Sequence, residues 1–342
     1  FLPDGFFRKI DIGVSAAKFS MDEFKKENGK KDYFGFQKLV PGIRFTFAEK
    51  NPRSTLNRFI QWKSYFFKEE SYRISYDSTF TPDTTITQKV KVLNNYRTLN
   101  QFLVVIENYR VLYPYRGELK IEQGKDFVRT AFTGKYFFNY AKEGGLDARL
   151  FAGKFFYSGS RTFSKQFETD RYHLNMTGAN GYEDYSYSDY FIGRNKFEGV
   201  ASHQIMVRDG GFKIRTDLLG DKIGKTDDWL VALNLGSTIP SNINPLNLLP
   251  IKIPLKVFVD IGTQAEAWES NSTEERFLFD AGIHIPILKE TINIYVPLVY
   301  SKIFTDYVKS YLPQKNRFFR TISFSIDISN FSLRKFNRSI PL

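Results

Sequence analysis

The 342-residue sequence contains no cysteine and only three histidines. The absence of cysteine excludes disulfide scaffolds, cysteine-ligated zinc, iron–sulfur clusters and thiol nucleophiles. The histidines, His173, His203 and His284, stand far apart in the chain, and no HExxH zinc-protease motif occurs. We therefore expect no catalytic residue, no metal site and no cofactor in this chain.

Long apolar runs are missing too, because no stretch of about 18 residues is free of polar side chains. This excludes a bundle of membrane-spanning helices. No stretch of about 12 residues combines a 3.6-residue period with capping residues, so we expect little helix. Aromatic residues are abundant by contrast, since 35 Phe, 20 Tyr and 3 Trp make up 17% of the chain, and the formal net charge is +12.

Apolar and polar side chains alternate along most of the chain. Val257 and Val259, for example, alternate with Lys256 and Asp260. Alternation of this kind is typical of strands with one apolar and one polar face. The segments that we predict to be strands are 8–20, 34–49, 57–77, 85–110, 115–140, 146–158, 195–218, 228–238, 254–268, 276–287, 291–303 and 317–330. Hairpins at 123–125 and 209–211 would raise the count from about 12 to about 14.

Two all-β architectures fit this pattern. In a soluble sandwich or barrel the apolar faces meet in a shared core, whereas in a membrane barrel they face lipid. Most of the predicted strands have 11 residues or more, which exceeds the typical sandwich strand of about 5–6 residues and suits a membrane crossing of about 9–11. Aromatic residues also gather at the ends of the apolar runs, as at Phe137, Phe155 and Trp268. The sequence therefore predicts a transmembrane antiparallel up-and-down β-barrel of about 12 strands, within a range of about 10–14.

A single outer-membrane barrel domain is predicted over residues 1–342. Long connections are expected near 21–33, 159–194 and 304–316, and the Pro-rich connection 240–254 is expected to form an ordered plug or rim. Because a sheet edge cannot stay open in lipid, we expect 317–330 to pair with 8–20.

The outward faces of the predicted strands are expected to contact lipid. The residues with this expectation are Val257, Val259, Ile283, Ile285, Ile294, Val296, Phe324 and Ile326.

The positive net charge requires an anionic partner. Nucleic acid lacks support, because no basic helix, zinc module or RNP-like motif occurs. Lipopolysaccharide fits a bacterial outer-membrane barrel better, since Arg and Lys side chains at the rim bind its phosphate groups. The candidate contacts are Lys25, Lys26, Lys30, Lys31, Arg161, Lys165 and Arg171. Other proteins of a larger envelope complex are further candidate partners.

Three short patterns resemble functional motifs without meeting their requirements. His284 lies on the inward face of a clear strand, where a structural hydrogen bond is favoured over metal binding. The segment 220–226 resembles a P-loop but is too short and lacks a following helix, which indicates a hairpin loop. Glu183, Asp184 and Asp189 lack the spacing of a calcium loop and are interpreted as solvated acids.

Two regions resemble a known family. Residues 189–199 (DYFIGRNKFEG), 202–204 (SHQ) and 208–213 (RDGGFK) are similar to the C-terminal region of large M1-type (gluzincin) metallopeptidases of Bacteroidota, and so is 145–153 (GLDARLFAG). In those proteins a peptidase region precedes an outer-membrane barrel. The resemblance implies that this chain is the barrel part. Because the HExxH motif has no counterpart here, no catalytic residue is carried over.

Three functions remain open at this stage. The first is a membrane anchor or scaffold for an attached metallopeptidase domain or a larger envelope complex, and the first residues, FLPDGF, suggest continuation from an upstream domain rather than a signal peptide. The second is an outer-membrane pore, although Phe258, Arg129, Lys256 and Asp260 are expected to fill part of a narrow lumen. The third is an enzyme with its active site in the loops or the lumen, and a soluble β-rich binding domain is a further alternative. We expect the anchor.

Overall fold

The computed structural model describes most of the chain. The described residues are 5–25, 30–51, 53–79, 85–141, 144–158, 172–194, 196, 198–216, 223–248, 253–272, 275–288, 290–312 and 314–328.

One antiparallel sheet of 12 strands dominates the fold. Its neighbours follow chain order, so the topology is up-and-down. The strands are β1 (Phe7–Lys25), β2 (Lys31–Phe47), β3 (Leu56–Thr79), β4 (Thr85–Asn108), β5 (Tyr115–Gln123), β6 (Phe127–Ala141), β7 (Gly144–Tyr157), β10 (Trp229–Thr238), β11 (Lys256–Gln264), β12 (Leu278–Ile287), β13 (Ile292–Tyr300) and β14 (Ser323–Ile326). Two short strands, β8 (Leu174–Asn175) and β9 (Lys225–Thr226), form a second sheet.

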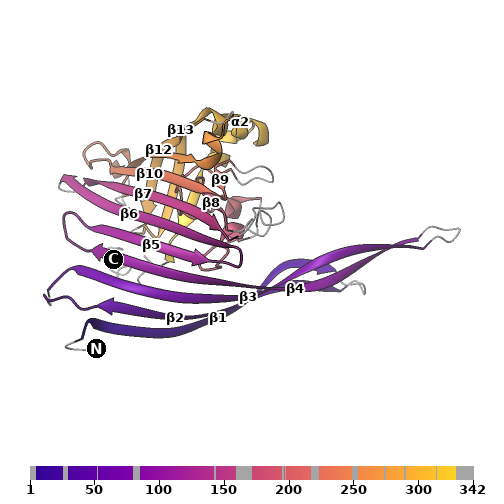
Figure 1. Ribbon diagram of the computed structural model, residues 1–342. Coiled ribbons are helices and arrows are strands. Elements are labelled where there is room, and N and C mark those ends of the chain that lie inside the picture. The colour runs from indigo at the N-terminus through magenta and orange to yellow at the C-terminus, as the bar shows by residue number, and fades with distance from the viewer. Residues whose placement is uncertain are drawn as a thin grey trace, which may run out of the picture.

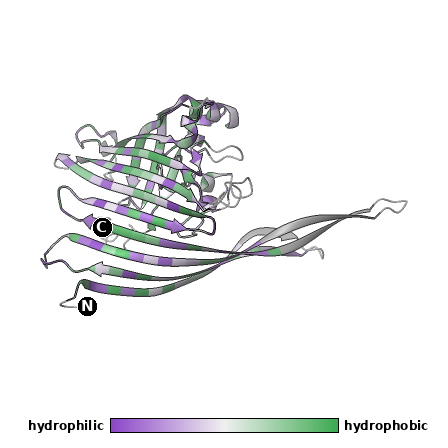
Figure 2. Cartoon of the chain, viewed as in Figure 1, coloured by the Kyte–Doolittle hydropathy of each residue, from purple (hydrophilic) through white to green (hydrophobic). Residues whose placement is uncertain are grey.

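The large sheet curls strongly, with β1 and β2 at the bottom and β12 and β13 at the top of the view in Figure 1. The strands β3 and β4 continue as a paired ribbon well past their neighbours (Figure 1). Green and purple positions alternate along many strands in Figure 2, as the two-residue period of the sequence predicts. The all-β, up-and-down antiparallel architecture of about 12 strands is thus confirmed.

Helices are few and short. The elements are η1 (Gly181–Glu183), η2 (Val200–His203), η3 (Pro245–Leu248), η4 (Ala265–Trp268), α2 (Lys302–Tyr311) and α3 (Arg317–Thr321). In the part of the chain that the structure describes, no helix combines the length and the apolar character needed to cross a membrane.

Two predicted strand segments differ from the structure. Residues 195–218 form no strand of the sheet in their described part; they contain η2 and irregular backbone, and this prediction was wrong. In the described part of the predicted strand 317–330, α3 occupies 317–321 and the strand is limited to 323–326. The predicted split at 123–125 is confirmed, since β5 and β6 form a hairpin there. The count stays at 12 because one segment splits and another leaves the sheet.

The two edges of the sheet are not paired with each other in the described ranges. β14 pairs with β13 through Ile292–Ile326 and Ile294–Phe324. On its other edge the Phe324 carbonyl accepts a hydrogen bond from the Ile205 amide at 2.8 Å. The expected pairing of 317–330 with 8–20 therefore stays a prediction.

Candidate functional site: the filled interior of the sheet

The outward and inward faces of the strands differ sharply in chemistry. Along β11, the apolar side chains of Val257, Val259 and Ile261 are 41%, 39% and 41% exposed. Between them, Phe258 is 3% exposed and Asp260 is completely buried. The sheet therefore presents apolar side chains outward and buries charged ones, which reverses the usual order of a water-soluble fold.

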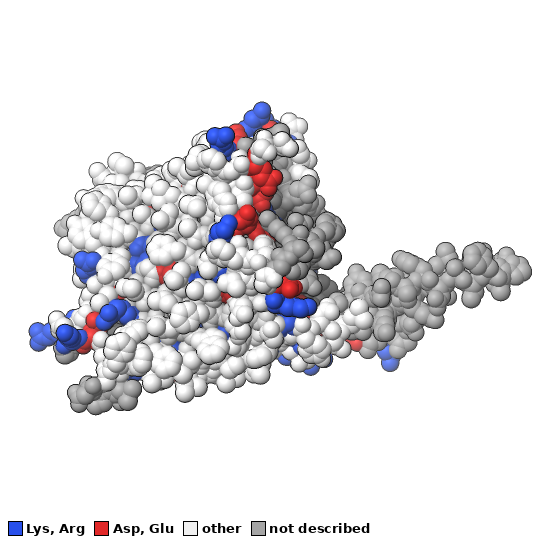
Figure 3. All heavy atoms as spheres, in the orientation of Figure 1, with Lys and Arg blue, Asp and Glu red and all other residues white. Residues whose placement is uncertain are grey.

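The outward apolar surface extends over most strands. Its members include Leu39, Trp62, Phe66, Phe102, Leu119, Phe132, Leu150, Phe156 and Leu233, all exposed by more than a third. In Figure 3 the face of the sheet toward the viewer is largely uncharged, and its Lys, Arg, Asp and Glu atoms gather mainly toward the two ends. Such a continuous apolar surface is far larger than the patch of a typical soluble monomer.

All eight residues predicted to face lipid lie on this outward face. Val257 and Val259 are exposed, and Ile283, Ile285, Ile294, Val296, Phe324 and Ile326 are half-exposed. Their inward neighbours include Tyr295 and Ser323, which are buried. The alternation predicted from the sequence therefore has the correct parity on these strands.

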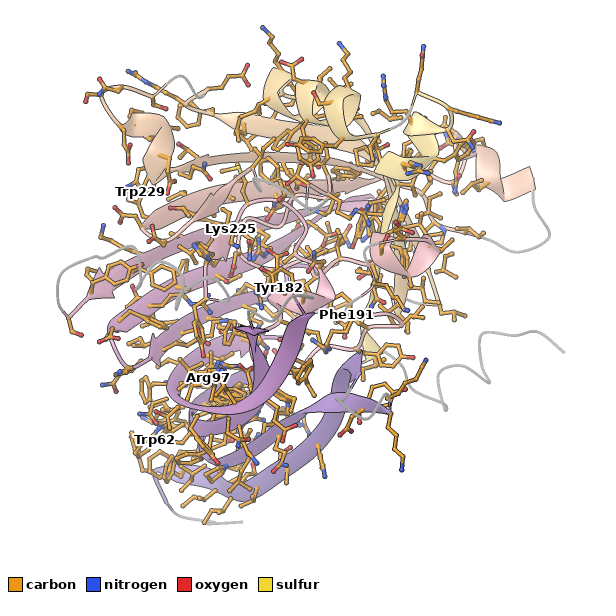
Figure 4. The ribbon with its side chains drawn as sticks, turned by 90° about the vertical axis from the view of Figure 1, so that its right-hand side faces the viewer. Trp62, Arg97, Tyr182, Phe191, Lys225 and Trp229 are labelled. Carbon is orange, nitrogen blue, oxygen red and sulfur yellow. The ribbon has the colours of Figure 1, made fainter. Side chains whose placement is uncertain are left out.

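The described residues of 172–216, called here the interior segment, occupy the space inside the curved sheet. Leu174, Met176, Phe212 and Ile214 are fully buried there, against Phe151 and Leu230 of the sheet among others. Figure 4 views the molecule along the sheet interior: Tyr182 of this segment lies inside the curve, while Trp62 of β3 lies on the outer side. The sheet is thus filled by its own chain.

Aromatic and basic side chains of β2 and β4 bind the interior segment at one side. The Lys38 Nζ donates hydrogen bonds to the carbonyls of Ser186 and Tyr187 at 2.9 and 2.8 Å. The ring of Tyr187 stacks on Phe36 with a centroid distance of 3.9 Å. Arg97 donates to the Tyr185 carbonyl at 3.1 Å.

A buried ion pair lies beneath these contacts. Glu122 of β5 and Arg129 of β6 are 1% and 2% exposed, and the Arg129 Nε donates to Glu122 at 2.7 Å. The hydroxyl of Tyr185 bonds to both groups, and Arg129 also donates to the Tyr172 carbonyl at 3.2 Å. A buried charge pair needs such additional hydrogen bonds to offset its desolvation. The interior segment supplies them.

The opposite side of the interior segment binds β11 and β12. The Lys213 Nζ contacts both carboxylate oxygens of Asp260, at 2.8 and 3.1 Å. The backbone amides of Lys213 and Ile214 donate to Asp280 at 3.0 and 2.8 Å. Asp260 and Asp280 face each other on neighbouring strands, so one lysine and two amides of the interior segment compensate two adjacent carboxylates.

A tight turn brings Lys213 to this position. Asp209 and Gly211 have φ of 47° and 71°. A Cβ atom on Gly211 would lie 2.8 Å from Arg149 and 2.9 Å from Asn234, and one on Gly210 would lie 2.4 Å from the Met176 backbone. Both glycines are therefore required by close packing. The Asp209-Gly210-Gly211 signal predicted a turn correctly but not its place inside the sheet.

Two of the three acidic residues that were expected to be solvated, Glu183 and Asp184, are buried. Asp184 is completely buried and accepts from Arg194 at 2.9 Å. Burial raises the pKa of the Asp184 carboxyl, but the guanidinium groups of Arg208 and Arg194 outweigh this effect and hold that pKa below its ordinary value. Glu183 is 3% exposed and caps the backbone amide of Asn180 at 2.8 Å. Asp189, by contrast, is exposed.

The other sequence candidates fall in several places. The His284 Nε2 is 2.9 Å from the Asn293 Oδ1, which confirms a structural hydrogen bond. Lys256 binds Asp147 and Glu290 at 2.9 and 2.7 Å. In the described residues, the ion pairs of Lys256 and Arg129 are therefore with these carboxylates and Glu122, and not with Asp260 or Asp280.

Of the seven basic residues predicted to contact lipopolysaccharide, two have side chains that the structure describes. Lys30 and Lys31 are exposed. The side chains of Lys25, Lys26, Arg161, Lys165 and Arg171 lie outside the described residues, as does 220–222 of the P-loop-like segment. Within the described ranges, no group of three or more His, Asp or Glu side chains is placed to hold a metal ion.

A cavity of about 420 Å³ remains inside the sheet between the interior segment and one end of the strands. Its walls include Lys135, Arg149, Phe258 and Tyr295, and its lining reaches the 108–115 connection and Glu290 of the β12–β13 turn. This end of the sheet carries the short β4–β5, β6–β7 and β12–β13 connections. The interior segment enters from the opposite end, between β7 and β10.

The similarity of this chain to known proteins is low. No family model and no curated protein matches the chain. Among solved structures, the chain is similar to CdiB from Acinetobacter baumannii, with 10% sequence identity and a TM-score of 0.42, over 86% of this chain and 45% of that one. The chain thus spans less than half the length of that structure, and the identity and structural agreement are too low to transfer any property from it.

Proposed function

We propose that this chain is an integral β-barrel of the bacterial outer membrane that serves as a non-catalytic anchor. The observation that carries this proposal is the reversed distribution of side chains, with apolar groups such as Val257 and Val259 outward and Asp260 buried. Lipid is the solvent in which this distribution is favourable.

Strand lengths support the same proposal. β10, β11, β12 and β13 contain 10, 9, 10 and 9 residues. A tilted strand needs about 9–11 residues to cross the hydrocarbon region. The outward aromatic side chains of Phe156 and Trp268, near strand ends, suit the membrane–water interface.

The filled interior favours an anchor over an open pore. Residues Phe212 and Ile214 are completely buried inside the sheet, and the interior segment is bound on two opposite sides, by Lys38 and Arg97 and by Asp260 and Asp280. Removing it would break several buried charge-assisted hydrogen bonds at once. The barrel then holds an attached domain, or a larger envelope complex, at the membrane.

The identity of the attached domain is a finer proposal. The resemblance of 189–199, 202–204, 208–213 and 145–153 to M1-type metallopeptidases favours a peptidase. Exposed Lys30 and Lys31 at the β1–β2 hairpin suit contacts with lipopolysaccharide phosphates.

A transport channel is the second candidate, and one observation favours it. The cavity of about 420 Å³ already opens the interior as far as Lys213 from the end with the short connections. Displacement of the interior segment would extend this cavity through the sheet.

Conductance measurements separate the two candidates. The purified chain, reconstituted in planar bilayers, is expected to give no steady current, whereas a variant with 172–216 replaced by a short Gly-Ser linker is expected to conduct. Flotation with liposomes serves as the control that both forms insert. Steady current from the intact chain would contradict the anchor and favour a pore. Failure of the intact chain to float with liposomes would contradict the membrane barrel.

A separate assay tests the attached peptidase. Zinc content and peptide hydrolysis are measured for this chain and for the full-length protein. We expect no hydrolysis by the chain alone, because three scattered histidines cannot supply a catalytic zinc site. Stoichiometric zinc with turnover in the isolated chain would contradict the anchor.

A further inference from the structure

A single row of inward side chains crosses the sheet, and its charges are separated by sign. Arg116, Lys135 and Arg149 follow one another on β5, β6 and β7. Farther along the same row, Asp260 and Asp280 follow one another on β11 and β12. Directly opposite side chains on neighbouring strands approach to about 5 Å, where like charges repel. Both parts of the row therefore need a compensating charge.

The acidic part of the row obtains this charge from the interior segment. The Lys213 ammonium binds Asp260 at 2.8 Å, and its backbone amide binds Asp280 at 3.0 Å. The Asn234 amide also donates to Asp260 at 2.9 Å. Both oxygens of Asp260 are thus engaged, whereas the Asp280 Oδ1 is buried without a hydrogen-bond partner. Neither carboxylate forms an ion pair with the basic part of the row in the described residues.

The basic part of the row is compensated only at its edge. Arg116 binds Glu107 at 2.6 Å and Glu118 at 2.8 Å. For Lys135 and Arg149, no ion pair occurs with any residue that the structure describes, and the polar contact of Arg149 is with the Asn234 Oδ1 at 2.6 Å. Lys135 and Arg149 thus lie opposite each other without an ion pair to a described residue. The carboxylates of Asp147 and Asp260 line the same cavity but are bound by Lys256 and Lys213.

Both cations line the cavity of about 420 Å³. Its volume is typical of a small-molecule site. The Phe258 and Tyr295 rings contribute an apolar wall, and Tyr109, Pro114 and Glu290 from two connections line its outer part. A small solute that enters from the end with the short connections therefore meets Lys135 and Arg149 inside.

We propose that this cavity is a binding site for a small anionic ligand, held through a phosphate or carboxylate group by Lys135 and Arg149. The planar guanidinium forms paired hydrogen bonds with two oxygens of such a group, and the ammonium adds a compact charge. The anionic ligand compensates the positive charges of Lys135 and Arg149, as Lys213 compensates the negative charge of Asp260. The site depends on the inward geometry and not on the anchor role.

Ligand binding to the purified full chain in detergent tests the site. Inorganic phosphate and acetate are titrated separately at constant ionic strength, with sodium chloride as the balancing salt, and binding is followed by calorimetry and by the shift of the thermal unfolding midpoint. Saturable binding is expected for at least one anion, and the anion that binds identifies the group as phosphate or carboxylate.

Variants then locate the binding. The double change Lys135→Gln with Arg149→Gln is expected to weaken binding by at least about 10-fold, because each charged hydrogen bond is worth about 1.5–3 kcal/mol. The matched control is Lys63→Gln, since Lys63 is an inward lysine that lines a separate cavity; its binding should stay within about twofold of the unchanged protein. Single Lys135→Gln removes a like-charge contact and is expected to fold as well as the unchanged chain. If the double variant does not fold, the single variant replaces it in the binding assay.

Two results would overturn the site. One is the absence of saturable binding for both anions, and the other is equal affinity in the Lys135 and Arg149 variants and in the unchanged chain. Steady current from the intact chain, or its failure to insert into membranes, would affect the anchor proposal alone, because the titration measures only the cavity.

Discussion

The two faces of the same strands differ in which side chains are exposed and which are buried. On β11, outward Val259 is 39% exposed, while its inward neighbour Asp260 is completely buried and bound by Lys213. The outward face therefore suits an apolar environment. The inward face suits contact with the interior segment of the same chain. Burying Asp260 is favourable only because that segment supplies its partners.

The largest effect is expected from removing the last strand, which exposes both faces and leaves β13 as an open edge. Deletion of residues 317–342 is expected to abolish membrane insertion rather than shorten a tail, because an unpaired edge is not tolerated in lipid. Co-sedimentation with liposomes and resistance to unfolding in detergent measure this. A truncated chain that still inserts would argue against a closed barrel.

A smaller but still large effect is expected on the inward face alone. Lys213→Ala leaves Asp260 and Asp280 without their cation, which should cost about 3–5 kcal/mol of unfolding free energy. Denaturant unfolding in detergent measures the change. The control is Lys154→Ala, because Lys154 pairs with Asp228 while 47% exposed, and exposed pairs contribute at most about 1 kcal/mol. An equal loss of unfolding free energy in both variants would show that the buried inward ion pair contributes no more to stability than an exposed one.

The outward face gives the complementary test. Val259→Lys is expected to cost about 2–4 kcal/mol in a bilayer, since a cation near its middle is poorly solvated. Ser325→Lys, on the inward face where Ser325 contacts the Tyr295 hydroxyl at 3.2 Å, should cost less. Unfolding in lipid vesicles measures both. Equal sensitivity of the two faces would point to a two-sided soluble core.

The faces could be predicted from the sequence because each strand carries its own two-residue signal. Val257, Val259 and Ile261 alternate with Phe258 and Asp260 in the sequence, and the same alternation separates exposed from buried side chains in the structure. The short turn at 123–125 was also identified from local residues. These features depend on neighbours in the chain.

The interior segment could not be predicted in the same way. Ile205, Val207 and the Asp209-Gly210-Gly211 turn resemble a hairpin of two strands, yet the partners of this region are Asp260, Asp280 and Phe324, which follow it by about 50–120 residues in the chain. One signal was available for α2: Ile303, Phe304, Tyr307 and Val308 recur at helical spacing, and three of them are buried.

The smallest expected effect concerns pH and tests the inward face from within the interior segment. The pKa of Asp184 lies below its ordinary value of 3.8 in the folded chain, since Arg208 and Arg194 outweigh the opposing effect of burial. A carboxyl with a lowered folded-state pKa stabilises the fold above its unfolded pKa, and this stabilisation is lost as the pH falls below about 4. Amide hydrogen exchange of 181–194 should therefore accelerate below about pH 4 relative to the outward strands. In Asp184→Asn the acceleration should be reduced, because the side chain no longer titrates, whereas exchange in β11 should be unchanged. An acid response that is the same in Asp184→Asn and in the unchanged chain would assign the pH dependence to other carboxylates of the interior.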